Sequence, residues 1–424
     1  MRKLVDSGID WVGAVPENWK FKKGKYLFQL RSERGNTIEL QLLSPTQKFG
    51  CIPQSLYEEL TGANAVKLNE KTDLNLLKTI HRGDFCISLR SFQGGFEYSD
   101  YEGVVSPAYQ VFYPTRNDVY RGYYKYMFKD GAFIDKMNSF TLSLRDGKNI
   151  AFADFGNTLL PRPSFEEQRT IADYLDKKTS EIDAAIKEAQ ELIEKYKAYK
   201  QSVITEIVTK GLDPQVPMKD SGVEWIGEIP VGWKIGRIKN VLKDSSLQTI
   251  TGEGEQLSVT QSSGIVKTSE IQVANPSLSQ AGWKIVNVGD IVFNKYKAHS
   301  GVFFVSPYDG IVTFNYSVYH CYKKIFPKYY VYLFKTSRCI GEFRKAMKGV
   351  GESISPLYTC DLFKIHTVIP PFEDQEAIAY YLDNKCSQID TIIAQKENLI
   401  SKLQEYKKSI IFEYVTGKKE VPNG

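Results

Sequence analysis

An internal repeat constrains this 424-residue chain more than any other feature of its sequence. The segment Asp6–Lys20 begins Asp-Ser-Gly and ends Trp-Lys, and it recurs 214 positions later as Asp220–Lys234. A second pair of segments, Phe165–Asp183 and Phe372–Asp390, shares Phe-Glu-acidic-Gln, Ile-Ala, Tyr-Leu-Asp and Ile-Asp at an offset of 207 positions. Because a repeat fixes architecture, we predict a duplicated unit with a pseudo-two-fold axis.

The stretches between the matched segments diverge but keep a common skeleton. Short β-branched and aromatic runs, separated by Gly, Asp and Pro, indicate strands and turns with some helix between them. We therefore predict an α+β fold with two globular domains. The predicted boundaries are an N-terminal junction at 1–20, a first globular domain at 21–163, a first helix at 164–210, a junction at 211–234, a second globular domain at 235–371, a second helix at 372–418 and a tail at 419–424.

The matched long segments have the pattern of helices. Apolar residues recur at alternating steps of four and three, which is typical of a coiled-coil seam. About 43 residues at 1.5 Å each give a rod of roughly 65 Å. We expect the two helices to pack antiparallel as a coiled coil; the alternative is that each packs on its own domain. The predicted seam residues are Ile171, Leu175, Ile182, Leu192, Tyr199, Ile378, Leu382, Ile389, Leu399 and Tyr406.

Positive charge is concentrated in the two divergent stretches. Residues 20–160 hold 19 Lys and Arg against 15 Asp and Glu, and residues 235–364 hold 16 against 9, whereas the whole chain has a net charge of only +5. The helical segments 164–210 and 372–418 each have a net charge of −2. This distribution favours two anion-binding surfaces on an acidic frame, with chance scatter of surface lysines as the alternative.

The sequence offers no motif for catalysis or metal binding. It lacks the GxxxxGK[ST] loop of nucleotide hydrolases, its six cysteines have no CxxC spacing, and its four histidines stand alone. We therefore predict no catalytic residue, no metal site and no cofactor bound by this chain. We expect a cytoplasmic protein, because its thiols are scattered, its start does not look like a secretory signal, and no apolar run approaches the roughly 18 residues of a membrane span.

Loops that mix basic, amide and aromatic residues occur at matching places in both halves. One pair is 88–95 and 294–301, and the other is 145–149 and 345–349. Arg and Lys can contact guanine or phosphate, and Asn and Gln can contact adenine. For each single residue an ordinary solvated loop is an equal alternative. The predicted DNA-binding residues are Arg90, Ser91, Gln93, Arg145, Lys148, Asn294, Lys295, Lys297, His299, Lys345 and Lys348.

With these motifs the sequence resembles the specificity subunits of type I restriction–modification systems. The resemblance is carried by the blocks Pro163–Asp183 and Pro370–Asp390, by the endings Val203–Thr209 and Ile410–Thr416, and by the Asp-Ser-Gly segments described above. One departure is Arg162-Pro163 in the first copy, where the second copy has two prolines. The resemblance covers essentially the whole chain in the expected order, but it names no base contacts, since the recognition domains vary within the family.

The resemblance implies two target recognition domains, each of which reads one half of a bipartite sequence in double-stranded DNA. The helices would dock two methyltransferase (modification) subunits, and restriction subunits would then join. S-adenosylmethionine, ATP and Mg are expected on those partners, and this chain is expected to be non-catalytic. Because the two domains differ in sequence, the target should be asymmetric with an unread spacer. The alternative function is a coiled-coil scaffold or interaction protein that binds another protein or a polyanion.

Overall fold

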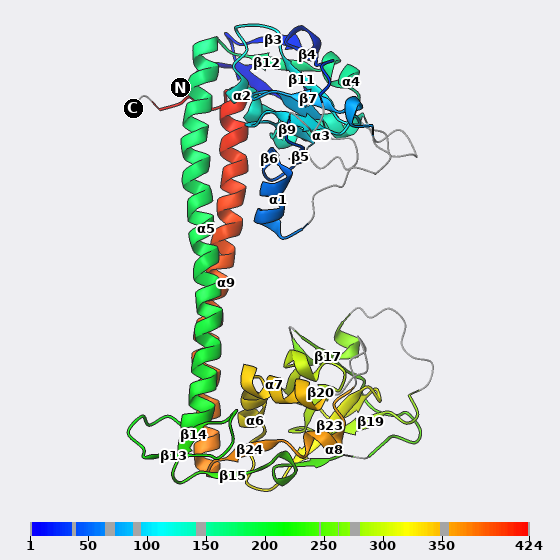
Figure 1. Ribbon diagram of the computed structural model, residues 1–424, viewed down its shortest axis with the longest axis vertical. Helices are drawn as coiled ribbons and strands as arrows, with labels where there is room; N and C mark the ends of the chain where they lie inside the picture. Colours follow the sequence, from blue (N-terminus) through cyan, green and yellow to red (C-terminus); the bar gives the residue numbers. More distant parts are fainter. Residues whose placement is uncertain are drawn as a thin grey trace. The chain divides into compact units, whose positions relative to one another are not determined.

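The structure is a computed structural model that describes residues 2–35, 40–63, 73–87, 95–140, 150–245, 247–261, 263–271, 280–347 and 356–422. The chain forms two compact units (Figure 1). Unit 1 comprises residues 1–189 and 398–424, and unit 2 comprises residues 190–397. The division passes through both long helices, α5 (Phe165–Lys210) and α9 (Phe372–Val415), so that each unit contains one part of each helix.

Unit 1 is built around an antiparallel sheet with the strand order β4-β11-β8-β9. These strands are β4 (Phe28–Leu30), β11 (Gln110–Pro114), β8 (Phe85–Ile87) and β9 (Phe96–Tyr98). The antiparallel pairs around the sheet are β1 (Leu4–Asp6) with β2 (Ala14–Pro16), β3 (Lys20–Lys23) with β12 (Leu159–Arg162), β5 (Leu43–Thr46) with β6 (Gly50–Pro53), and β7 (Lys78–Ile80) with β10 (Gly103–Val105). The short helices are α1 (Gln54–Thr61), α2 (Arg121–Met127), α3 (Gly131–Ser139) and α4 (Phe152–Asn157).

Unit 2 repeats this plan with the sheet order β16-β23-β20-β21. These strands are β16 (Leu242–Asp244), β23 (Tyr316–Cys321), β20 (Ile291–Asn294) and β21 (Phe303–Val305). The surrounding pairs are β13 (Met218–Asp220) with β14 (Glu228–Pro230), β15 (Lys234–Arg237) with β24 (His366–Ile369), β17 (Leu257–Thr260) with β18 (Gly264–Lys267), and β19 (Lys284–Val286) with β22 (Gly310–Val312). The short helices are α6 (Pro327–Phe334), α7 (Ser337–Ala346) and α8 (Thr359–Leu362).

Each unit has an aromatic core between its sheet and its helices. In unit 1, Phe28 lies 5.9 Å from Phe85 and 5.1 Å from Tyr124, ring centroid to ring centroid. In unit 2, Phe293 and Phe303 lie 4.5 Å apart. All five side chains are at most 1% exposed. Such rings bury large apolar areas and dominate core energetics, so these cores fix the sheets from which the surface loops project.

The structure confirms the predicted α+β class, and the repeat extends to matching polar contacts. The indole nitrogen of Trp19 donates to Glu167 at 3.1 Å in unit 1, and that of Trp233 donates to Asp374 at 2.8 Å in unit 2. The amide of Gln168 accepts from the backbone of α2's N-cap residue Tyr120 at 2.7 Å. Gln375 accepts likewise from Phe326 at 2.8 Å before α6. The motif residues that revealed the repeat therefore connect each helix start to its own unit.

The two long helices run antiparallel within each unit. In unit 1 the rings of Tyr174 and Tyr414 lie 4.6 Å apart, and Lys407 pairs with Asp183 at 2.7 Å. In unit 2, Lys200 pairs with Asp390 at 2.6 Å, and the end of α5 shares a cavity with the first turns of α9. These ion pairs are largely exposed, so each stabilises its unit by at most about 1 kcal/mol. A coiled coil that is continuous along both helices stays a prediction.

The predicted seam positions differ in burial. Ile171, Leu175, Ile182, Ile378, Leu382 and Ile389 are at most 6% exposed. Leu192 is half-buried, while its neighbour Ile193 is only 6% exposed. Tyr199, Leu399 and Tyr406 are 47%, 42% and 52% exposed. These last three depart from the predicted stripe, because an α-helix turns every 3.6 residues and a strict 3.5-residue stripe drifts away from the contact line.

The predicted domain boundaries stay predictions, although the sheet pairings bear on them. β3 pairs with β12, which brings residues 20–23 beside 159–162. β15 pairs with β24, which brings residues 234–237 beside 366–369. Each globular part therefore begins and ends on one two-stranded sheet next to the start of a long helix.

Candidate nucleic-acid interface

Six of the predicted DNA-binding residues lie outside the described part of the chain. They are Arg90, Ser91, Gln93, Arg145, Lys148 and Lys348. The remaining five belong to unit 2. Four of these, Asn294, Lys295, Lys297 and His299, follow one another at the end of β20 and in the turn after it.

The backbone of this turn is held in place from several sides. The side-chain oxygen of Asn294 accepts from the backbone amide of Tyr296 at 2.9 Å. Lys295 donates its backbone amide to Asn315 at 3.2 Å, and its carbonyl accepts from Leu357 at 2.9 Å. Lys297 is exposed, so its ammonium is presented to solvent beside a fixed loop.

His299 and Lys345 differ from the exposed Lys297 in their surroundings. The Nδ1 atom of His299 is buried without a hydrogen-bond partner among the described residues. Lys345 lies on α7, pairs with Glu342 at 2.7 Å, and lines a different cavity of about 410 Å³ together with Trp225. The structure thus separates Lys345 from the loop that follows β20.

A larger cleft of about 800 Å³ lies beside Asn294 in unit 2. Three amide side chains line it, from Gln256, Asn294 and Asn315, together with the aromatic rings of Trp283 and Tyr316. We call this the amide cleft. All five of these residues are half-buried, so their side chains are accessible but partly fixed by packing.

Three chain segments bring the amides together. Gln256 precedes β17 and forms a parallel bridge with Ile311 of β22. Asn294 ends β20, directly opposite Tyr316 in the antiparallel register of β20 and β23. Asn315 lies in the turn between β22 and β23. Gln256 and Asn315 were not predicted as site residues, because no basic residue stands beside either one in the sequence.

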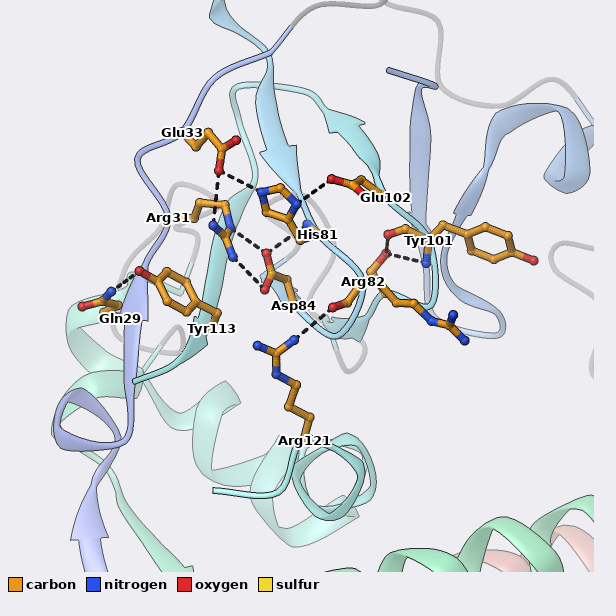
Figure 2. Close-up of polar contacts among 11 residues, drawn as sticks. Gln29, Arg31, Glu33, His81, Arg82, Asp84, Tyr101, Glu102, Tyr113 and Arg121 are labelled. Atoms are coloured by element: carbon orange, nitrogen blue, oxygen red, sulfur yellow. Dashed lines mark hydrogen bonds and ion pairs between the residues drawn. The ribbon is translucent and has the colours of Figure 1, made fainter. Parts of the chain in front are cut away.

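Unit 1 presents a different polar cluster (Figure 2). Arg31 makes two hydrogen bonds to the buried carboxylate of Asp84, at 2.6 and 3.1 Å. Burial is the largest single influence on the pKa of Arg31 and lowers it, but the hydrogen bond and charge of Asp84, together with the charge of Glu33, raise the pKa overall. In unit 2 the matching carboxylate, Asp290, instead contacts His320. The matching aspartates therefore contact an arginine in unit 1 and a histidine in unit 2.

His81 bridges two carboxylates in this cluster. Its Nε2 lies 2.8 Å from Glu33 and its Nδ1 lies 2.7 Å from Glu102. The hydrogen bond with Glu33 raises the pKa of His81, and the bond with Glu102 adds to the effect. The pKa of Glu33 is lowered in turn by His81. When His81 is protonated, each nitrogen of its imidazolium ring therefore donates to a carboxylate.

Two guanidinium groups lie beside this cluster without an acidic partner among the described residues. Arg82 is exposed, and Arg121 donates to the backbone carbonyl of Arg82 at 3.0 Å (Figure 2). Gly83, with φ of +89°, makes this approach possible, because a Cβ there would collide with the Arg121 guanidinium. We call Arg82 and Arg121 the arginine pair.

The arginine pair is specific to unit 1. The repeat aligns Gly83 with Gly289 and Tyr123 with Tyr329, so the matching positions in unit 2 are Val288 and Pro327. Arg121 also lines a polar cavity of about 560 Å³ in unit 1. The neighbouring cations there, Arg116 and Lys125, pair with Asp118 and Asp176. The arginine pair is the part of this surface best suited to bind an added anion.

Two further features, a metal-binding cluster and a membrane-spanning helix, are absent from the described residues. Within the described ranges, no cluster of three or more His, Cys, Asp or Glu side chains could hold a metal ion. In that same part of the chain, no helix combines the length and apolar character needed to cross a membrane.

Comparisons with known proteins relate part of the sequence to a family and the whole chain to solved folds. Residues 16–195 match the family described as type I restriction modification DNA specificity domain. One similar solved chain, from a structural study of complex assembly and conformational transition of the type I R-M system, has a TM-score of 0.69 at 15% identity. The match covers 96% of this chain and 99% of that chain.

A second similar structure is the HsdS subunit from Thermoanaerobacter tengcongensis. Its TM-score is 0.55 at 15% identity, over 96% of this chain and 98% of that one. No curated protein matches the sequence. At 15% identity these structures establish the fold, while the matched domain establishes the family of residues 16–195. The resemblance to specificity subunits is therefore confirmed: the chain contains a type I restriction modification DNA specificity domain and has the fold of these solved chains nearly throughout.

Proposed function

We propose that this chain is the DNA-reading subunit of a type I restriction–modification assembly. Each unit reads one half of a bipartite, asymmetric target in double-stranded DNA, and the base pairs between the halves are not read. The chain supplies sequence specificity and no active site. The chemistry belongs to its partners, which bind S-adenosylmethionine, ATP and Mg.

One observation carries this proposal: a single scaffold is used twice and bears two different polar surfaces. The hydrogen bonds of Trp19 and Trp233 to the helix starts are the same in both units. The arginine pair exists only in unit 1, and the amides of the amide cleft line a cavity of unit 2. Two surfaces of different chemistry on equivalent scaffolds suit two half-sites of different sequence.

The long helices provide the docking surface for partners in this proposal. Two modification subunits dock at quasi-equivalent places, and restriction subunits join through them. The similar chain from the study of type I assembly supports a role in such a complex. The six cysteines are free thiols, which suits the cytoplasm, where thiols stay reduced.

The deciding experiment is to co-express the full chain with its cognate modification subunit and to map methylated adenines across the genome. We expect one motif with two unlike halves and a fixed gap, and no such methylation without this chain. Replacement of residues 235–364 by the corresponding part of a relative should change only one half. Methylation that is independent of the chain, or a change in both halves after the replacement, would contradict the proposal.

A salt titration separates DNA reading from a scaffold that binds protein. Duplex binding by cationic loops releases counterions, so the logarithm of the affinity falls steeply and linearly with the logarithm of salt concentration. An apolar protein interface lacks this dependence. A flat salt response with full complex formation would favour the scaffold function instead.

A further inference from the structure

We propose that the amide cleft reads adenine in the half-site of unit 2, with Gln256, Asn294 and Asn315 as specificity-determining residues. This inference rests on the proposed DNA-reading function and names the base that this surface recognises.

The lining of the amide cleft is polar but carries little charge. Glu255 is the charged residue among the described residues of the cleft, and its carboxylate accepts from the hydroxyl of Ser269 at 3.2 Å. The described lining contains no Lys or Arg, so it cannot neutralise a phosphate inside the cleft. The cleft therefore suits a neutral partner that carries both donors and acceptors, which describes the edge of a base.

The polar edge of a carboxamide matches the major-groove edge of adenine. A carboxamide presents one acceptor and one donor side by side, and the major-groove edge of adenine presents N6 as a donor beside N7 as an acceptor. Guanine presents two acceptors there and is matched by Arg or Lys instead. The described lining has three amides and no guanidinium or ammonium group. The cleft therefore selects adenine over guanine.

The amide groups of the cleft are available to bind a base. Asn294 uses its oxygen to hold the backbone of Tyr296, which fixes the side chain and leaves the NH₂ group to donate. The side chains of Gln256 and Asn315 have no hydrogen-bond partner among the described residues, although both are half-buried. Half-buried amides gain more from a new partner than fully solvated ones, because part of their hydration is already lost.

Residues next to the cleft can contact the rest of the base pair and the DNA backbone. Phe314 lies between the cleft residues Thr313 and Asn315, and its side chain is 63% exposed. An apolar side chain in this position can contact the thymine methyl group of an A·T pair. Lys295 and Lys297 directly follow Asn294 and can contact phosphates, which position a protein on DNA without reading sequence.

The test uses three substitutions that remove a donor and keep the shape of the side chain. Asn294→Asp keeps the oxygen that accepts from Tyr296 but replaces the NH₂ group with a second acceptor, which repels adenine N7. Asn315→Asp and Gln256→Glu make the same change at the other two amides. Gln215→Glu is the matched control, because it adds the same charge at an exposed position in the loop after α5.

Each full-length variant is co-expressed with the modification subunit, its methylated motif is mapped, and binding is measured on duplexes with each base substituted in turn. We expect each of the three to lose roughly 10- to 100-fold of the preference for adenine at one position of one half-site. The other half-site and the Gln215→Glu motif should stay unchanged. Thermal unfolding identifies any variant that does not fold, and the inference is then judged on the variants that do fold.

The inference is overturned if the wild-type chain reads a bipartite motif and the folded variants read the same motif with the same preference for adenine. That result is expected if the cleft binds a small molecule instead of a base. The inference is also overturned if the variants weaken binding to all sequences equally. Neither result affects the proposed function. A wild-type chain that directs no sequence-specific methylation would instead refute the proposed function itself.

Discussion

The phenolic hydroxyl of Tyr123 donates to the backbone carbonyl of Val415 at 2.6 Å, although 292 positions separate the two residues. In unit 2 the hydroxyl of Tyr329 donates to the carbonyl of Val208 at 2.7 Å. Both carbonyls lie in the last turn of a long helix, where backbone acceptors lack an intrahelical donor. The end of α9 therefore completes unit 1 in the same way that the end of α5 completes unit 2.

This equivalence predicts that the chain tolerates circular permutation. The ammonium of Lys418 also donates to the carbonyl of Val12 at 2.8 Å, so the N-terminal segment packs against the end of α9 within unit 1. A permutant that opens near Asp213 and joins Gly424 to Met1 through a Gly/Ser bridge should fold and direct methylation of the same motif. The measurement is the methylated motif together with the thermal unfolding midpoint.

The control for this permutant is one opened inside α5, next to Ala189, which breaks a helix and should fail to fold. The prediction is contradicted if permutants opened near Asp213 fail with every bridge length tried.

The tyrosine bonds predict local and separable losses of stability. Tyr123→Phe leaves the carbonyl of Val415 without a donor, at an expected cost of about 1–3 kcal/mol. Hydrogen exchange followed by mass spectrometry should show faster exchange in the last turns of α9 and no change at the end of α5. Tyr329→Phe should give the reverse pattern. Tyr26→Phe, at a 59% exposed side chain, is the control; the same exchange in all three variants would show that the bonds do not anchor the helix ends.

The helices and the repeat could be predicted because their signals are local. The predicted helix at 164–210 corresponds to α5 (Phe165–Lys210), and the one at 372–418 corresponds to α9 (Phe372–Val415). The hydroxyl of Ser164 accepts from the backbone of Glu167 at 3.2 Å, as a helix-capping serine does. The exposure of Tyr199 could not be predicted, because it depends on how far the stripe drifts around a long helix.

The arginine pair predicts a change in salt dependence without a change in motif. Arg82→Gln and Arg121→Gln should each weaken binding to all duplexes and reduce the slope of log K against log salt by about 1, as loss of one phosphate contact does. The measurement is fluorescence anisotropy of labelled duplexes over a series of salt concentrations. Lys402→Gln, at an exposed position on α9, is the control. An altered motif would show that these arginines contact bases, and an unaltered slope would remove them from the interface.

The candidate site was less predictable than the helices because distant strands assemble it. Asn294 was predicted from its own loop, where an amide adjoins two lysines. Gln256 and Asn315 join it only through the bridge to Ile311 and the register of β20 against β23. Such pairings follow from side-chain burial on both faces of a sheet, which the local sequence does not determine. Lys345 was predicted from a similar loop but lies on α7 beside a different cavity.

The His81 bridge predicts that unit 1 loses stability as the pH rises above neutrality. The pKa of His81 is raised, chiefly by its bond to Glu33, so the folded state favours the protonated ring. Its contribution is full below the unfolded value of about 6.5 and is lost as the pH rises through the folded pKa. The lowered pKa of Glu33 acts in the opposite direction, since its contribution is lost as the pH falls below its ordinary range. Because His81 is 34% exposed, we expect a loss of at most about 1 kcal/mol.

Urea unfolding at pH values from about 5 to 9 measures this effect. The free energies of unfolding of the wild type and of His81→Gln should converge at alkaline pH. The control is His366→Gln, at an exposed residue of unit 2, which should follow the wild type throughout. A constant difference between wild type and His81→Gln over the whole range would show that the bridge acts through packing and not through its charge.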